Sequence, residues 1–343
     1  MTAQQPILVL GAGSWGTALA LVLARNGRPV WLWSREAEQV ELMTKTRQNA
    51  HFLPNSHFPE TLQPIANLTD SVPQVNDIVV VVPSHGFRET LQKIAPYLTT
   101  TARLCWATKG LENDTGLLLH QVAEQVLGSA RPLAILSGPS FAKEVAAGLP
   151  TAVTIASQDT QYADDLVSLF HNHSFRPYTS IDMIGVQVGG AVKNIMAIAA
   201  GVTDGLGLGA NTRAALITRG LMEIMRFGSA LGGQHETFMG LAGLGDLILT
   251  CTDNQSRNRR FGYALAQGAD IKQAQTEIGQ VVEGVRAARE VNRLAEQLGI
   301  DMPIVKQVNQ VLQGICTPKQ AVQTLLSREP KPEFQNDSNS NNT

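Results

Sequence analysis

Three glycines directly after the first apolar run constrain this chain more than any other feature. The run at 7–10, ILVL, leads into GAGSWG at 11–16, and a helix-like stretch begins next. Glycines at this spacing, between a strand and a helix, allow a tight turn and a close approach of the backbone to a pyrophosphate, whose charge the helix N-terminus stabilises. The sequence therefore predicts a dinucleotide-binding turn with Gly11, Gly13 and Gly16 as binding residues. A glycine-rich turn without a ligand is the alternative.

The fold class follows from how apolar runs are spaced along the chain. Short aliphatic runs recur, separated by amphipathic stretches, at 7–10, 30–33, 78–82, 104–108 and 133–136. This alternation predicts a parallel, doubly wound sheet, whereas the Ala-, Leu-, Met- and Gly-rich segments after about residue 184 have helical spacing. The predicted class is α/β, with a Rossmann-like domain over 1–183, an all-helical substrate-binding domain over 184–327 and a disordered polar tail over 328–343.

Charge and cysteine usage narrow the function. Lys and Arg number 27 and Asp and Glu 29, a net charge of −2, so a local cluster must hold any anionic ligand, and a general nucleic-acid binder is disfavoured. Three widely separated cysteines fit neither a disulfide framework nor a CxxC metal pattern and favour a reducing compartment. No export signal or membrane span is predicted. His171 and His173 lack further ligands at suitable spacing, so no metal is predicted.

The second apolar run points to the type of dinucleotide. It is followed by Ser34 and Arg35, close to the position about 20 residues past the glycines where NAD enzymes carry an acidic residue for the ribose 2′-hydroxyl. An arginine there can pair with a 2′-phosphate, which favours NADP(H) over NAD(H). Glu36 leaves room for NAD(H), and a solvated surface arginine is the alternative. The predicted cofactor is NADPH, with NADH as a second possibility.

Three later strand-like runs end in loops of small residues. These loops are PSHG at 83–86, KG at 109–110 and SGPSFA at 137–142. In an open α/β sheet, ligands bind beyond the carboxyl ends of the strands, so the loops and Lys109 are predicted to line one edge that takes a phosphorylated or carbonyl substrate. For any single loop, a turn chosen only for its geometry is as good an explanation.

A lysine lies in the middle of the most apolar predicted helix, residues 184–202. Burial of an ammonium is costly, so Lys193 must find an anion, a cleft or a lowered pKa. A lysine that faces a cofactor can donate a proton to a carbonyl oxygen while hydride arrives at the carbon. The alternative is a lysine whose amine extends to the surface.

Two more polar groups follow in the second half. Asp246 comes directly after the glycine-rich segment 240–245, where a lone aspartate is commonly a helix N-cap. The segment SRNRR at 256–260 has three arginines ahead of an apolar run; an arginine beside a helix N-terminus is a good phosphate clamp. A solvated basic face or a nucleic-acid patch is the alternative for this segment.

The order and spacing of these blocks resemble the NAD(P)-dependent glycerol-3-phosphate dehydrogenase family in its bacterial form. The resemblance covers about residues 6–326 through GAGSWG, VVPSHGFRE, ATKGLE, SGPSFAKEV, GAVKNIMAIAAG, GLAGLGDLILTCT, SRNRRFG and QVVEG. It implies a cytoplasmic homodimer that reversibly reduces dihydroxyacetone phosphate to sn-glycerol 3-phosphate with NADPH and supplies glycerophospholipid synthesis. Two other hypotheses are a related two-domain hydroxyacid dehydrogenase and an NADPH-binding sensor without chemistry.

The resemblance also implies roles for individual residues. Lys193 would be the acid or base, positioned by Asn194 and Asp246. The implied cofactor contacts, besides the glycines, are Ser14, Trp15, Arg35, Lys109, Ala142, Arg257, Val281 and Glu283. The implied substrate contacts are Lys109, Gly138, Ser140, Lys193, Asp246, Thr250, Ser256, Arg257 and Asn258.

Overall fold

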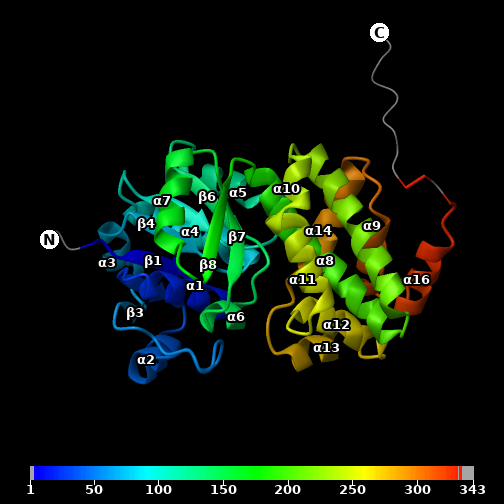
Figure 1. Cartoon of the computed structure of the whole chain (residues 1–343), viewed down its shortest axis with the longest axis horizontal. Coiled ribbons are helices and arrows are strands. Elements are labelled where there is room, and N and C mark those ends of the chain that lie inside the picture. The colour runs from blue at the N-terminus through cyan, green and yellow to red at the C-terminus, as the bar shows by residue number, and fades with distance from the viewer. Residues whose placement is uncertain (1–3, 331, 334–343) are drawn as a thin grey trace, which may run out of the picture.

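The computed structural model describes residues 4–330, 332 and 333, and it places a sheet-containing half beside a helical half (Figure 1). The last strand in the described residues ends at Ser180, and a long helix begins at Met183. The predicted fold class, a Rossmann-like sheet followed by an all-helical second half, is therefore confirmed. Residue 331 and residues 334–343, most of the predicted disordered tail, lie outside the described residues.

The strands form one sheet in the order β3-β2-β1-β4-β5-β6-β7-β8. They are β1 (Ile7–Leu10), β2 (Val30–Trp33), β3 (Leu62–Ile65), β4 (Asp77–Val80), β5 (Arg103–Trp106), β6 (Leu133–Ser137), β7 (Thr151–Ser157) and β8 (Phe175–Ser180). All neighbouring pairs are parallel except β6 with β7. The order reverses at β1, which lies between β2 and β4, and a ligand crevice is expected at such a switch point. The glycine turn follows this strand.

Both faces of the sheet are covered, which explains why the central strands are almost uniformly aliphatic. In β1, Ile7 and Val9 join one buried cluster while Leu8 and Leu10 join another. The covering α-helices are α1 (Ser14–Arg25), α2 (Ala37–Thr46), α3 (Leu68–Ser71), α4 (Phe87–Ile94), α5 (Leu119–Leu127), α6 (Ala142–Ala146) and α7 (Thr160–Phe170). Short 3₁₀ turns are η1 (Val72–Gln74), η2 (Ser84–Gly86) and η3 (Ala95–Tyr97).

The helical half is built around one long apolar helix, α8 (Met183–Gly205). It is long and apolar enough to cross a membrane, but 94% of its most apolar window is buried inside the protein, so it serves as a core helix. The elements that follow are α9 (Gly209–Ala230), α10 (His235–Met239), the π-helical turn η4 (Leu241–Gly245), α11 (Asp246–Thr252), α12 (Arg257–Ala266), α13 (Ile271–Ile278), α14 (Glu283–Gln297), α15 (Pro303–Leu312) and α16 (Pro318–Leu326).

Helix α12 packs against α8 through glycines, so that the two backbones touch. A Cβ on Gly201 of α8 would lie 1.9 Å from the carbonyl oxygen of Arg259. A Cβ on Gly262 of α12 would lie 2.0 Å from the carbonyl oxygen of Ile198. Backbone atoms cannot move aside as flexible side chains do, so these two glycines fix the position of α12 along α8.

We expect Gly262→Ala to lower the free energy of unfolding by about 1–3 kcal/mol, the usual effect of overpacking a tight core. Gly245→Ala is the matched control, because Gly245 also has helical backbone angles and a Cβ there would come no closer than 3.6 Å to a neighbour. Urea unfolding followed by circular dichroism measures both. Equal stability of the two variants would contradict the proposed backbone contact.

Candidate active site

The glycine turn between β1 and α1 has the geometry of an anion cradle. Gly11 has φ +117°, and a Cβ on Gly16 would lie 1.9 Å from the Gly11 carbonyl oxygen, so both positions require glycine. Gly13 is the N-cap of α1; no atom lies within 4 Å of where its Cβ would be, and no side chain caps the helix. The buried Nε1 of Trp15 has no hydrogen-bond partner among the described residues. Open space, a free helix N-terminus and an unpaired donor fit a dinucleotide pyrophosphate.

The other predicted cofactor residues of the sheet half lie around this turn. Ser14 Oγ donates to the Phe52 carbonyl at 2.7 Å, which ties a loop to the start of α1. Arg35 follows β2 with 76% of its side chain exposed, and its Nε lies 3.1 Å from Glu36 Oε1. Such an exposed pair contributes little stability, so it does not prevent the guanidinium from pairing with a ligand phosphate. Ala142 begins α6, which packs against α1.

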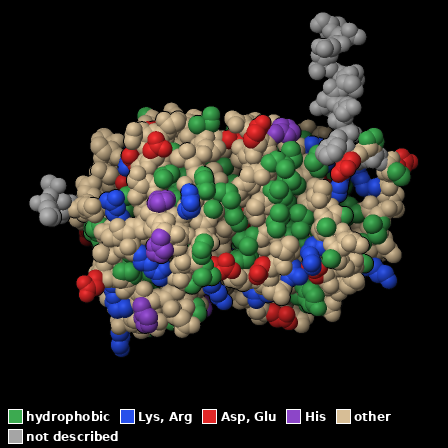
Figure 2. Space-filling view, in the orientation of Figure 1, with side chains coloured by type: hydrophobic (Ala, Val, Ile, Leu, Met, Phe, Trp, Pro, Cys, Tyr) green, Lys and Arg blue, Asp and Glu red, His purple; other side chains and the backbone are tan. Residues whose placement is uncertain are grey.

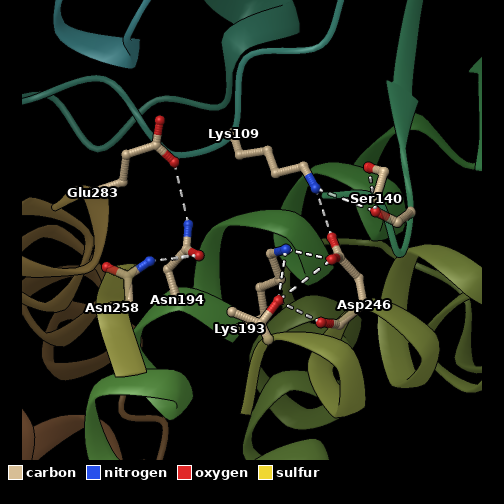
Figure 3. Close-up of polar contacts among 9 residues, drawn as sticks. Lys109, Ser140, Lys193, Asn194, Asp246, Asn258 and Glu283 are labelled. Atoms are coloured by element: carbon tan, nitrogen blue, oxygen red, sulfur yellow. Dashed lines mark hydrogen bonds and ion pairs between the residues drawn. The ribbon is translucent and has the colours of Figure 1, made fainter. Parts of the chain in front are cut away.

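One buried carboxylate joins the two halves of the molecule (Figure 3). Asp246, the first residue of α11, forms an ion pair through Oδ1 with Lys193 Nζ of α8. Its Oδ2 lies 2.7 Å from Nζ of Lys109, which comes from the loop after β5. Lys193 also donates to Thr250 Oγ1 at 2.9 Å. The lysine that the sequence placed in an apolar helix is thus buried beside an anion.

The charges of this cluster do not balance, because two ammonium groups share one carboxylate. The pKa of Lys193 is lowered to about 8, because burial and, to a lesser degree, the charge of Lys109 lower it by more than Asp246 raises it. A lysine whose pKa lies near the working pH can both donate and accept a proton at a useful rate. The cluster therefore has the properties of an acid–base site.

A chain of side-chain amides lies next to the lysine and links three helices (Figure 3). Asn194 Nδ2 donates to Glu283 Oε2 of α14 at 3.3 Å, and Asn258 Nδ2 of α12 donates to Asn194 Oδ1 at 2.9 Å. The backbone N–H of Gly284 in turn donates to Asn258 Oδ1 at 2.9 Å. These bonds fix which end of each amide faces its neighbour.

The loop after β6 approaches the cluster from the sheet half. Lys109 Nζ donates to the Gly138 carbonyl at 3.4 Å, and Ser140 Oγ donates to the same oxygen at 3.0 Å. Gly138 has φ +148°, and a Cβ there would lie 3.0 Å from the Cα of Val153, which explains the glycine. The predicted common edge of the sheet thus brings Lys109, Gly138 and Ser140 together.

The arginine-rich segment begins α12. Ser256 is its N-cap, buried, and its Oγ accepts from the Arg259 N–H at 3.2 Å. Arg257 Nη1 donates to Gln280 Oε1 at 3.0 Å. Gln280 begins the QVVEG block at 280–284, but no role was predicted for it. Val281 follows it and is 43% exposed.

The structure thus brings the predicted residues into two contacting groups. One contains Lys109, Gly138, Ser140, Lys193, Asp246 and Thr250, and the other contains Asn194, Asn258 and Glu283. In the described part of the chain, Arg35, Ala142, Arg257 and Val281 have no hydrogen bond to either group. Nor do any three His, Cys, Asp or Glu side chains of that part converge as a metal site requires.

Two family models together match almost the whole chain. The NAD-dependent glycerol-3-phosphate dehydrogenase N-terminus matches residues 6–163, and the C-terminus of the same family matches residues 182–323. The chain belongs to the NAD-dependent glycerol-3-phosphate dehydrogenase family. The resemblance found in the sequence is confirmed, and so is the assignment of the chain as an NAD(P)-dependent oxidoreductase.

Individual relatives support the same assignment over nearly the full length. The chain is 57% identical to the glycerol-3-phosphate dehydrogenase [NAD(P)+] of Nitrosococcus oceani over 327 residues, 95% of each chain. It is 55% identical to the enzyme of the same name from Serratia proteamaculans over 333 residues, 97% of this chain and 98% of the relative. A crystal structure of glycerol-3-phosphate dehydrogenase from Coxiella burnetii superimposes with a TM-score of 0.92 at 53% identity, covering 95% of this chain and 99% of that one.

More distant structures share only the architecture. D-mandelate dehydrogenase, solved in a ternary structure with NADH and anilino(oxo)acetate, has a TM-score of 0.64 at 13% identity over 92% of this chain and 99% of that one. This likeness shows the shared fold alone. It does not favour the hydroxyacid dehydrogenase alternative, because the family models and the relatives above 50% identity all match glycerol-3-phosphate dehydrogenase.

We expect Asp246→Asn to destabilise the protein by about 3 kcal/mol at pH 7, because it leaves two buried ammonium groups without their anion. The change also removes the group that raises the pKa of Lys193. With its folded-state pKa lower still, Lys193 binds fewer protons folded than unfolded, so stability rises with pH through the alkaline range. The deficit relative to the unmodified protein should therefore be smaller at pH 9.5 than at pH 7.

Chemical unfolding at the two pH values measures this deficit. Asp164→Asn is the control, because Asp164 is exposed on α7. A deficit for Asp246→Asn that is the same at both pH values would show that Lys193 does not depend on this carboxylate for its charge.

Proposed function

We propose that this chain reduces dihydroxyacetone phosphate at C2 with NADPH to give sn-glycerol 3-phosphate, and that Lys193 is the proton donor. The observation that carries the proposal is the buried ammonium of Lys193, with its lowered pKa, at the junction of the sheet half and the helical half. Family membership and the names of the close relatives support the reaction.

The chemistry requires a hydride at carbon and a proton at oxygen. When bound, NADPH supplies the hydride to the C2 carbonyl carbon. Lys193 then donates its proton to the oxygen, which would otherwise carry the charge of an alkoxide, and in the reverse direction neutral Lys193 accepts the hydroxyl proton. Asp246 and Thr250 hold the amine in place through the ion pair and the 2.9 Å hydrogen bond. Lys109 adds a second positive charge that favours the developing oxyanion.

The start of α12 is proposed to hold the substrate phosphate. Ser256, Arg257 and Asn258 lie at the N-terminus of this 10-residue helix, where backbone N–H groups and the helix dipole favour an anion. Asn258 contacts Asn194, the neighbour of Lys193, so an anion at this end lies on the same side as the acid. The guanidinium of Arg257 supplies charge-assisted hydrogen bonds to a phosphate.

Each half of the chain is proposed to have its own role in binding and catalysis. Residues 1–183 bind the dinucleotide through the glycine turn, Ser14, Trp15 and Arg35, while residues 184–327 carry the acid and the phosphate site. Ala142, Arg257, Val281 and Glu283 are proposed as further cofactor contacts, and Gly138 and Ser140 as substrate contacts beside Lys109. Glu283 is supported by its bond to Asn194, which places it near the reacting end.

We further propose that the enzyme works in the cytoplasm as a homodimer. Cys105, Cys251 and Cys316 are all unpaired, which suits a reducing compartment. Figure 2 shows hydrophobic side chains gathered over the helical half around α10, a kind of surface that subunit interfaces bury. The glycerol 3-phosphate it forms is proposed to supply glycerophospholipid synthesis, the usual role of the family.

Replacement of the acid tests the mechanism. Lys193→Met should lower the rate of dihydroxyacetone phosphate reduction by about 10²–10⁴-fold, the usual contribution of a general acid. The dissociation constant for NADPH should change less than twofold, because the glycine turn lies in the other half. NADPH consumption followed by absorbance gives the rate, and NADPH fluorescence gives the affinity.

The pH profile of the unmodified enzyme gives an independent check on the same residue. Reduction needs protonated Lys193, so its kcat/KM should be level below about pH 8 and fall above it, while glycerol 3-phosphate oxidation rises over the same range. Level profiles from pH 7 to 9.5 in both directions would contradict the assignment.

The two alternative functions predict other outcomes. A sensor without chemistry would bind NADPH without turnover, and a hydroxyacid dehydrogenase would turn over hydroxyacids faster.

The exposed arginine after β2 is proposed to set the preference for NADPH. Arg35→Ala should weaken NADPH binding about tenfold, the loss of one charge-assisted hydrogen bond, and change NADH binding less than twofold. Glu36→Ala is the matched control, since it removes the paired carboxylate and should leave NADPH binding equal or tighter. Equal losses of NADPH and NADH affinity in Arg35→Ala would refute the role.

A further inference from the structure

One arginine of the basic segment makes contacts that the proposed reaction does not use. Arg259 is two residues past Arg257, but its side chain, only 12% exposed, turns toward the end of α8. Its Nε and Nη2 lie 3.0 Å and 2.5 Å from Oδ2 of Asp204, which is itself 11% exposed. Its Nη1 donates to Asn254 Oδ1, in the loop between α11 and α12.

The backbone of the same residue is also fixed on both sides. Its N–H donates to Ser256 Oγ, the cap of α12, and its carbonyl oxygen occupies the space that a side chain on Gly201 would fill. Arg259 therefore connects three parts of the helical half: the core helix α8, the first turn of α12 and the loop at 253–256.

The loop at 253–256 lies before the glycine contacts between α8 and α12, which begin only within α12. Besides the link to Arg259, it is held by Gln255, whose Nε2 donates to Glu144 Oε1 at 2.7 Å. Gly262 and Gly201 fix the helix, whereas the chain before Ser256 lies outside the helical hydrogen-bond ladder. The link from Arg259 to Asn254 connects this chain directly to Asp204 through one rigid guanidinium. A planar guanidinium with several fixed donors suits such a three-way connection, which a lysine cannot make.

We propose that Arg259 is a positioning residue: through Asp204 and Asn254 it holds the 253–256 loop and the first turn of α12 so that Ser256, Arg257 and Asn258 face the substrate phosphate. The inference rests on the proposed phosphate site at this helix terminus. Loss of the link displaces phosphate ligands but leaves Lys193 and Asp246 unaltered. The cost therefore falls on substrate binding rather than on the proton transfer.

Steady-state kinetics with the full chain tests the proposal. Arg259→Ala should raise KM for dihydroxyacetone phosphate about tenfold, as displacement of binding groups does, with kcat within threefold and the NADPH dissociation constant unchanged. Arg259→Lys keeps the pairing with Asp204 but not the link to Asn254, so it should restore the melting temperature more fully than KM. If Arg259→Ala does not fold, Arg259→Lys still tests the positioning role, because a restored melting temperature together with a raised KM supports it and a normal KM contradicts it.

Arg213→Ala is the matched control, because Arg213 Nη1 binds the other oxygen of Asp204 at 2.8 Å and has no link to the loop. Its KM should stay within twofold of the unmodified enzyme. Equal KM increases in Arg213→Ala and Arg259→Ala, or an unchanged KM in Arg259→Ala, would overturn the positioning role.

Arg257→Ala separates this inference from the site on which it depends. A raised KM in Arg257→Ala with a normal KM in Arg259→Ala refutes the positioning role alone. Normal KM values in both variants remove the proposed phosphate site, and the inference with it.

Discussion

The sharing of one buried carboxylate by two lysines is the interaction on which the rest of this structure depends. Lys109 comes from the sheet half and Lys193 from the core helix of the helical half, and Asp246 pairs with both. Removal of three charges from water is costly, and only close pairing compensates for it. The two halves must therefore stay in register at this point, which is where we propose that cofactor and substrate meet.

The cluster has two ammonium groups and one carboxylate, and this excess of positive charge suits the proposed proton transfer. Burial is the main cause that lowers the pKa of Lys193 to about 8, and the nearby charge of Lys109 adds to this lowering, while Asp246 opposes it. The same excess favours an anionic ligand and a developing alkoxide, both of which restore neutrality. Without Lys109, the cluster would be balanced and the pKa of Lys193 would be higher.

The residues alone predicted that Lys193 needs a partner, but only the family resemblance named Asp246 as the residue that positions it. An ammonium in an apolar helix must have an anion, a cleft or a lowered pKa, and Lys193 has a buried anion and a lowered pKa. Its partner is 53 residues away and follows a glycine-rich turn, where an aspartate has the pattern of an N-cap; the structure instead has Gly245 as the N-cap. Strands β3, β7 and β8 were missed because they lack the uniformly aliphatic character of the central strands. β3 and β8 each contain a proline, and β7 contains two threonines and a serine. Long-range pairing leaves no local signal.

The close packing of α8 against α12 sets the geometry of the site, but it requires glycines, which lower the intrinsic stability of a helix. Glycine in a helix is less favourable than alanine by about 1 kcal/mol, yet α8 and α12 both carry glycines where they touch. Asn194 meets Asn258, and four residues later on each helix Ile198 meets Gly262, so the two helices run in the same direction over this stretch. The close backbone contact between Ile198 and Gly262 fixes the distance between the side chains of Asn194 and Asn258. The same glycines that pack the core of the helical half therefore set how far Lys193 on α8 lies from the N-terminus of α12, the proposed phosphate site.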